Sequence, residues 1–199
     1  MLLTRWLSQF SQSLARHRRR PQVQDVLRPS ELANRVDVLE DRTLLAAPHP
    51  FDLATLNGTN GFRLDGIDAG DQSGRSVSSA GDVNGDGFDD LIIGAFRADP
   101  GGDIDAGETY VVFGKSSGFT AAVDLNTLNG TDGFRLDGID AGDLSGVSVS
   151  SAGDVNGDGF DDLIIGAHGA DTNGDIDAGE TYVVFGKSSG FTAAVDLST

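Results

Sequence analysis

The 199-residue chain contains no cysteine, five prolines, one tryptophan and two tyrosines. The absence of cysteine excludes a disulfide framework and a thiolate metal site. No stretch approaches the roughly 18 consecutive apolar residues that a membrane-spanning helix needs. Because proline is scarce and 28 residues are glycine, we expect many tight turns between short strands rather than a disordered linker.

Basic residues are also scarce, and they are unevenly distributed. The formal net charge is −17, yet residues 1–50 carry eight arginines against five acidic residues. Residues 51–199 therefore hold six basic and 26 acidic residues, a net charge of −20. A surface this acidic repels nucleic-acid phosphates and attracts divalent cations. The charge excludes non-specific nucleic-acid binding by this part of the chain and favours a cation as its ligand.

Residues 1–47 differ in kind from the rest and form the first predicted segment. Apolar residues at near-helical spacing precede the basic run 16–20, so a helical or disordered segment is expected. Residues 39–45, Leu-Glu-Asp-Arg-Thr-Leu-Leu, resemble the Leu-Glu-x-Arg-x-Leu-Leu segment near the start of many large bacterial surface and secreted proteins. The resemblance implies export to the cell surface or medium. A short helix with no special role is the alternative.

The rest of the chain is a tandem repeat with a period of 72 residues, because Leu56-Asn-Gly-Thr recurs at Leu128. Residues 56–127 and 128–199 differ at only eight positions. We therefore divide this part into a first repeat, 48–127, and a second repeat, 128–199.

Each repeat contains one acidic loop with the spacing of a cation site. Residues 82–90 read Asp-Val-Asn-Gly-Asp-Gly-Phe-Asp-Asp, and residues 154–162 repeat them. Oxygen-bearing side chains fall at positions 1, 3, 5 and 9, and glycine at position 6 permits a sharp turn. Hard cations such as Ca²⁺ prefer six to eight oxygen ligands. The loop chemistry therefore predicts Ca²⁺, with an acidic turn that holds no metal as the alternative.

Four short strands are expected in each repeat, with no helix between them. In the first repeat they are 62–64, 76–79, 91–95 and 109–113. The apolar runs 91–95 and 109–113 are continuous, which is typical of strands covered on both faces. Four strands in a tandem unit indicate an all-β protein built as a β-propeller.

The repeat unit resembles the FG-GAP repeat. The similarity lies in Ser73-Gly74, the acidic loop with the following Leu-Ile-Ile-Gly-Ala, and Gly107-Glu-Thr-Tyr-Val-Val-Phe-Gly. FG-GAP repeats build the seven-bladed propeller of integrin α chains and of many bacterial surface proteins. The resemblance implies two blades of an incomplete propeller, with calcium in the loop between the first two strands of each blade. By position, the implied ligands are Asp82, Asn84, Asp86, the Phe88 carbonyl and Asp90, and Asp154, Asn156, Asp158, the Phe160 carbonyl and Asp162.

Other site readings fit less well. An EF-hand needs an acid at loop position 12, where this chain has Ile93 and Ile165. The acidic residues 171–180 form either a solvated hairpin loop, which we favour, or a further cation site. The glycines before Lys115 do not have the spacing of a phosphate-binding loop. A Ser-His-Asp catalytic site would depend on His168, and the equivalent residue in the first repeat is Phe96.

The expected strand order gives one complete blade, because the outer strand of a blade would come from the repeat that follows. The second repeat then lacks its outer strand, so further blades, or residues 62–64 of another copy, would complete it. The resulting prediction is a non-catalytic, secreted or cell-surface module for adhesion or for binding a protein or glycan ligand. The alternatives are an accessory propeller fragment of an extracellular enzyme and a purely structural repeat.

Overall fold

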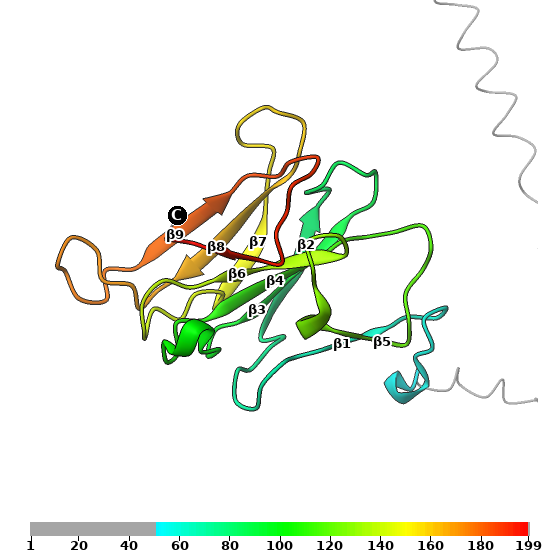
Figure 1. Ribbon diagram of the computed structural model, residues 1–199, viewed down its shortest axis with the longest axis horizontal. Coiled ribbons are helices and arrows are strands. Elements are labelled where there is room, and N and C mark those ends of the chain that lie inside the picture. The colour runs from blue at the N-terminus through cyan, green and yellow to red at the C-terminus, as the bar shows by residue number, and fades with distance from the viewer. Residues whose placement is uncertain (1–50, 199) are drawn as a thin grey trace, which may run out of the picture. The chain divides into compact units, whose positions relative to one another are not determined.

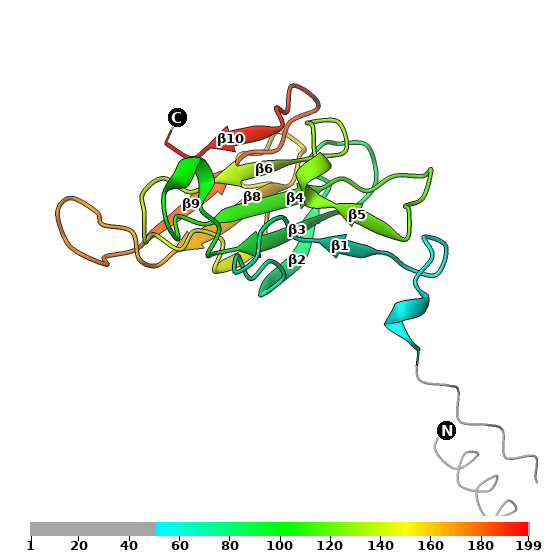
Figure 2. The same ribbon diagram turned by 60° about the horizontal axis from the view of Figure 1, so that its bottom comes forward.

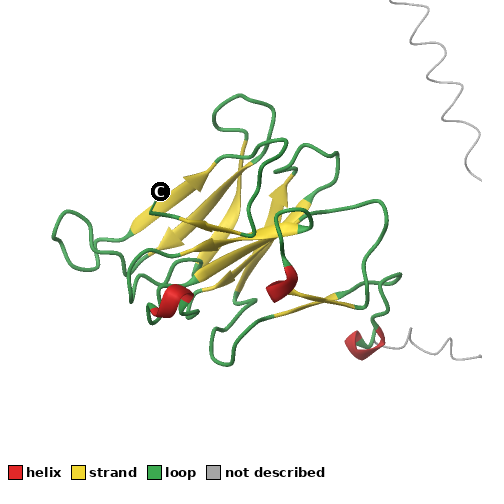
Figure 3. Cartoon of the chain, viewed as in Figure 1, coloured by secondary structure: helices red, strands yellow, loops and turns green. Residues whose placement is uncertain are grey.

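The computed structural model describes residues 51–198, which form short strands, tight loops and single-turn 3-10 helices (Figures 1 and 3). The predicted export segment, 1–47, lies outside the described residues. The strands are β1 (Arg63–Asp65), β2 (Ser76–Gly81), β3 (Asp90–Ala95), β4 (Glu108–Val112), β5 (Ala122–Asp124), β6 (Gly133–Asp137), β7 (Ser148–Gly153), β8 (Asp162–Ala167), β9 (Glu180–Val184) and β10 (Ala194–Asp196). The 3-10 helices are η3 (Leu53–Thr55), η4 (Pro100–Gly102) and η5 (Leu125–Thr127).

The strands of the first repeat build a sheet that is completed by a strand from the second repeat. Strands β2, β3 and β4 are antiparallel neighbours, and β6 pairs antiparallel with β4. We call β2–β3–β4–β6 the first blade. Strand β10 pairs in parallel with the far edge of β6, as Figure 2 shows. Strands β7, β8 and β9 form the second blade, which has three strands.

A two-stranded parallel sheet lies outside these blades. Strand β1 pairs with β5, with Leu64 opposite Val123. Strand β6 pairs with β10 in the same way, with Leu136 opposite Val195. Residues 61–65 and 133–137 share the sequence Gly-Phe-Arg-Leu-Asp. Strand β1 is thus an outer strand that, among the described residues, has no blade to complete.

The main hydrophobic core lies between the two blades. Its largest fully buried members include Phe134 from β6 and Leu163 and Ile165 from β8. The buried residues of this core are Ala80, Val83, Ile92, Val111, Phe113, Phe134, Leu136, Val149, Leu163 and Ile165. The strands β2 and β7 lie side by side across it (Figure 1). A second cluster on the opposite face of the first blade joins Ile93, Tyr110 and Val112 to Leu125 and Leu128.

Coverage of the blades on both faces holds only for the first one. All five residues of β4 are buried, as its continuous apolar run predicted. The same sequence in β9 alternates between half-buried and exposed, so the prediction is wrong there. The physical reason is that, within residues 51–198, no third blade packs on the second. The sheets do not close on themselves, so the all-β fold is that of an incomplete propeller. None of the helices in this range has the length and hydropathy to cross a bilayer.

Candidate metal centre

The first acidic loop, 82–90, connects β2 to β3. The pairing of these strands shifts register between Ser79 and Gly81, which bends the end of β2. Gly85 and Gly87 then adopt φ angles of 72° and 89°, a left-handed conformation that glycine enters without steric cost. The chain therefore reverses within a few residues, which brings alternate side chains to the inside of the turn.

The polar side chains of this loop fold back onto its own backbone. The Asp82 carboxylate accepts hydrogen bonds from the N–H groups of Asp86 and Gly87, both at 3.0 Å. The Asn84 side-chain oxygen accepts from the Asp86 N–H at 2.9 Å, and Asp86 Oδ1 accepts from the Phe88 N–H at 2.9 Å. The oxygens at loop positions 1, 3 and 5 are thus gathered in one hydrogen-bonded turn.

Asp90, at loop position 9, is held from the opposite side. Its side chain is fully buried, with Oδ2 accepting from the Val83 N–H at 2.9 Å and Oδ1 from the Gly114 N–H at 2.8 Å. Burial, with a smaller contribution from the nearby Asp86 and Asp82, raises the pKa of Asp90 to about 6 despite these two hydrogen bonds. A divalent cation in the loop would oppose this shift, because it favours the ionised carboxylate.

The second loop, 154–162, repeats the arrangement. The Asp154 carboxylate accepts from the N–H groups of Asp158 and Gly159 at 3.1 and 3.0 Å. The Asn156 side-chain oxygen accepts from the Asp158 N–H at 2.9 Å. Asp162 is fully buried, and its oxygens accept the N–H groups of Val155 and Gly186, both at 2.9 Å. The structure therefore brings the four predicted side chains of each loop into the same local arrangement.

The donor set of both loops fits calcium chemically. Each loop offers three carboxylates, one amide oxygen and backbone carbonyls, including those of Phe88 and Phe160, and calcium prefers such hard oxygen ligands. Residues 51–198 contain no group of three or more His, Cys, Asp or Glu side chains arranged to hold a metal ion. In this structure, the loop carboxylates accept backbone N–H groups instead.

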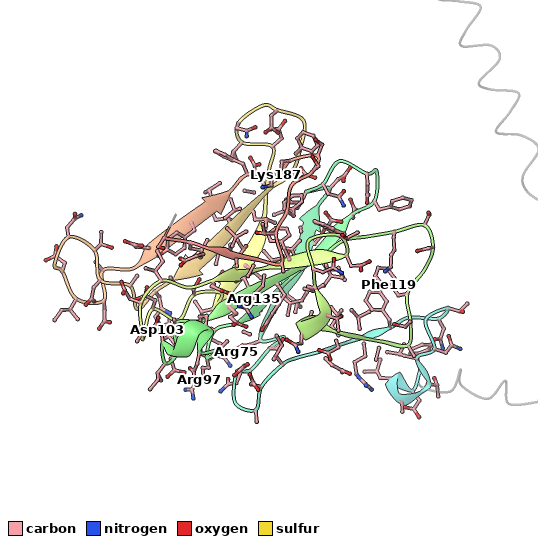
Figure 4. The ribbon with its side chains drawn as sticks, viewed as in Figure 1. Arg75, Arg97, Asp103, Phe119, Arg135 and Lys187 are labelled. Atoms are coloured by element: carbon pink, nitrogen blue, oxygen red, sulfur yellow. The ribbon has the colours of Figure 1, made fainter. Side chains whose placement is uncertain are left out.

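The two loops also contact each other. Asp161 Oδ2 accepts from the Asp82 N–H at 2.8 Å, and the Asp161 N–H donates to the Asp82 carbonyl at 3.2 Å. This approach needs Gly81, because a Cβ there would lie 2.2 Å from Asp161 Oδ2. The N–H of Lys187, labelled in Figure 4, donates to the Val83 carbonyl at 3.0 Å. The first loop is therefore fixed in part by the second blade.

Sequence reasoning missed this role of Asp161. Asp89 is its counterpart in the first repeat and has the same neighbours in sequence. Asp89 is nevertheless exposed, because no blade lies beside it among residues 51–198. No signal in the sequence separates the two residues, since only their positions in the array differ.

The second acidic segment, 171–180, forms the predicted hairpin loop. Thr172 and Asp175 make an isolated antiparallel bridge, and the Asp177 N–H donates to Asp171 Oδ1 at 2.8 Å. Figure 4 shows Asp103, in the corresponding segment of the first repeat, well separated from Lys187, whose N–H donates to the first acidic loop. These segments are therefore not part of the loop site.

Residues 73–112 and 145–184 match the model of the FG-GAP repeat. Each match contains one acidic loop and the three strands β2–β4 or β7–β9. The chain therefore contains two FG-GAP repeats, and the incomplete propeller described above is built from them.

Several animal proteins are similar to this chain. It is 33% identical over 138 residues to integrin alpha-PS2 of Drosophila melanogaster, and the aligned region makes up 67% of this chain and 9% of that protein. It is 32% identical over 109 residues to integrin alpha-5 of Xenopus laevis, and the aligned region makes up 55% of this chain and 10% of that protein. It is also 32% identical over 117 residues to phosphatidylinositol-glycan-specific phospholipase D of Bos taurus, covering 59% and 14%. The chain thus spans about a tenth of the length of these relatives.

Proposed function

We propose that this chain is a calcium-binding, non-catalytic extracellular module for cell-surface adhesion or ligand binding. One Ca²⁺ binds in each acidic loop, 82–90 and 154–162. The ligands are the side chains at loop positions 1, 3, 5 and 9 and the carbonyl at position 7. They are Asp82, Asn84, Asp86, Phe88 and Asp90, and Asp154, Asn156, Asp158, Phe160 and Asp162.

The observation that carries this proposal is the same closed turn in both loops. In each loop, oxygens at positions 1, 3 and 5 are gathered on one turn while the acid at position 9 is buried and anchored. Asp82 and Asp86 raise the pKa of Asp90, so these negative charges repel one another in the absence of a cation. Calcium would neutralise them, and these residues would hold the β2–β3 and β7–β8 connections in place.

The extracellular and adhesive parts of the proposal rest on other support. Two of the three similar proteins described above are integrin α chains. The net charge of −20 on residues 51–199 suits a calcium-rich medium and disfavours nucleic-acid partners. The export segment predicted in residues 1–47 belongs to the same proposal. The partner is a protein or glycan ligand, or further blades that cover the open faces.

One observation favours a second candidate, an accessory propeller fragment of an extracellular enzyme. A phospholipase D is among the similar proteins, although this chain corresponds to only 14% of it. Under this reading the repeats support or position a catalytic region that lies in a different sequence.

Calcium titration of the full chain tests the metal site. Calorimetry should show two calcium ions per chain, with dissociation constants on the order of 10⁻⁴ to 10⁻³ M or somewhat tighter. Calcium should also raise the thermal midpoint, because it binds the folded state. The double variant Asp86→Ala, Asp158→Ala removes one acid from each loop and should lose both responses.

The matched control is the double variant Asp103→Ala, Asp175→Ala, which removes two acids from the hairpin segments outside the loops. It should bind calcium like the parent. If the parent protein gave neither heat nor a thermal shift with calcium, the proposal would be wrong.

A further inference from the structure

Within residues 51–198, two faces of the blades are open, and both are apolar. The face of the second blade that points away from the first carries Val155, Val183 and Phe185, which are 57%, 46% and 54% exposed. Their counterparts in the first repeat, Val83, Val111 and Phe113, are 1%, 0% and 5% exposed because they pack against the second blade. We call this open surface the trailing face.

The first blade has a complementary open surface, which we call the leading face. Val77, Phe88 and Leu91 are exposed there. The counterparts of Val77 and Leu91 in the second repeat are Val149 and Leu163, and both are buried in the core between the blades. The leading and trailing faces are therefore the two halves of the interface that already joins the first and second blades.

Glycines mark the trailing face as a surface built for close contact. In the first blade, a Cβ on Gly94 would lie 1.9 Å from the Gly146 carbonyl oxygen. A Cβ on Gly85 would lie 2.3 Å from the ring of Phe160. The counterparts Gly166 and Gly157 have no such neighbour, since the closest atom to a Cβ on Gly166 is 3.6 Å away in Ser148. The second blade fills the space beside Gly94 and Gly85 of the first blade. The equivalent space beside Gly166 and Gly157 of the second blade is open.

Polar groups on the two faces are also matched. In the chain, the N–H groups of Gly138, Gly142 and Ser145 donate to carbonyls of the loop 104–107. The Leu144 N–H does the same to Asp105. Gln72, the counterpart of Leu144 in the first repeat, has another side chain but the same left-handed backbone, with a φ angle of 55° against 57° in Leu144. The same backbone donors are therefore presented by residues 66–73 and the same acceptors by residues 176–179.

The free strand edges of the two blades are complementary in the same way as the two faces. Strand β4 pairs with β6 so that Tyr110 lies opposite Arg135, and Arg135 Nη1 is 3.4 Å from Glu108 Oε1. Strand β9 has the sequence of β4, and its outer edge is unpaired within residues 51–198. Strand β1 has the sequence of β6 and, among the same residues, pairs on one side only, with β5. In the same register, Arg63 would lie opposite Tyr182 and beside Glu180.

We infer that a second copy of this chain docks its leading face and strand β1 onto the trailing face and strand β9 of the first. The contact reproduces the internal interface between the blades, so the occupant is defined by the repeat itself. The proposed function leaves further blades as one possible partner, and this inference, which rests on that function, identifies those blades as a second copy of the chain. The interface is heterologous, so copies join head to tail and form either a ring or a filament. Three or four copies would supply six or eight blades, within the roughly four to eight of closed propellers.

The test is sedimentation velocity and light scattering of the full chain in calcium at increasing concentrations. The parent chain should form species at integer multiples of its mass. Gly166→Ala should block the trailing face, because its methyl would meet the carbonyl of Gly74 in the next copy. Val77→Asp should block the leading face. Each variant alone should be monomeric, with Phe185→Asp as a second trailing-face variant.

Mixing gives the decisive result. Gly166→Ala retains a leading face and Val77→Asp retains a trailing face, so a mixture should form a one-to-one dimer and nothing larger. Ile104→Asp changes an apolar side chain that is 67% exposed although its blade already packs on the second one, so it lies outside both open faces and should assemble like the parent. A parent chain that stays monomeric at all concentrations would overturn the inference, and so would a mixture without the dimer. Calcium titration of monomeric Gly166→Ala tests the metal loops independently of assembly.

Discussion

The two repeats form a natural experiment, since they differ at eight of 72 positions and occupy different environments. Tyr110 is fully buried, whereas its counterpart Tyr182 is half-buried. Glu108 and Glu180 differ in the same direction, whereas Asp89 is exposed and its counterpart Asp161 is half-buried. Burial in this molecule is thus decided by which neighbour a repeat has, and the residues of the repeat itself are the same in both cases.

The stability of such an array is the sum of the intrinsic stability of each repeat and the interfaces between neighbours. Here one interface is formed within the chain. The same substitution made in each repeat therefore separates the interface contribution from the intrinsic one. Each prediction below compares such a pair, beginning with the largest expected difference.

The largest difference is expected for the outer-strand phenylalanines. Phe134 is 1% exposed, stacks on Phe191 with ring centroids 4.7 Å apart, and contacts Phe113. Phe134→Ala should lower the free energy of unfolding by about 3–5 kcal/mol, because it leaves a cavity in the core between the blades. Phe62 is only half-buried and stacks on Phe119 at 4.0 Å. Phe62→Ala should cost roughly 1 kcal/mol, mainly the aromatic contact.

Denaturant unfolding of the two variants measures this difference. It should be done in calcium and at concentrations where the chain is monomeric. Equal losses of stability in both variants would show that the core between the blades contributes no more than the β1–β5 pair does.

Much of this fold could be predicted from the repeat sequence, because strand spacing and turn residues act locally. The strands beginning at Ser76, Asp90 and Glu108 lie within a residue of their predicted starts. The acid at position 9 and the glycines at positions 4 and 6 determined the shape of the loop, since they set where the chain can reverse. The origin of β6 in the following repeat also followed from the order of the strands.

Other features could not be predicted, because they depend on the position of a repeat in the array. The continuous apolar run of β9 predicted burial on both faces, yet Val183 is 46% exposed. The parallel pairing of β10 with β6 had no signal in the sequence, since Ala194–Asp196 is too short to show a periodic pattern. The hydrogen bond from the first loop to Asp161 and the exposure of Asp89 could not be predicted either, because the two residues have the same sequence neighbours. Tertiary neighbours, which a repeated sequence does not encode, decided these cases.

A smaller difference is expected for the acids at loop position 8. Asp161 links the second loop to the Asp82 N–H, whereas Asp89 is exposed. Asp161→Ala should lower the free energy of unfolding by about 1 kcal/mol, the net value of a typical hydrogen bond. Asp89→Ala should change it by less than about 0.5 kcal/mol, as is usual at the surface. Asp89 and Asp161 each precede a predicted calcium ligand, so thermal unfolding should be measured both with calcium and with a chelator. Asp161→Ala should be the more destabilising variant under both conditions.

The smallest difference concerns pH, and it compares Glu108 with Glu180. Burial raises the pKa of Glu108, and this outweighs the hydrogen bond from the Tyr110 hydroxyl and the charge of Arg135. Between the ordinary pKa of a glutamate and the raised one, the folded protein therefore binds a proton that the unfolded chain has released. The free energy of unfolding must fall as pH rises through this window, by at most about 1.4 kcal/mol per pH unit for one proton. Glu108→Gln should remove this contribution, so that stability falls less steeply as pH rises above 4.5, the ordinary pKa of a glutamate. Glu180→Gln, at the half-buried counterpart, is the matched control against which the change of slope is measured. An unchanged slope in Glu108→Gln would mean that Arg135 already holds Glu108 ionised across the window, and that the interior of the first blade tolerates its charge.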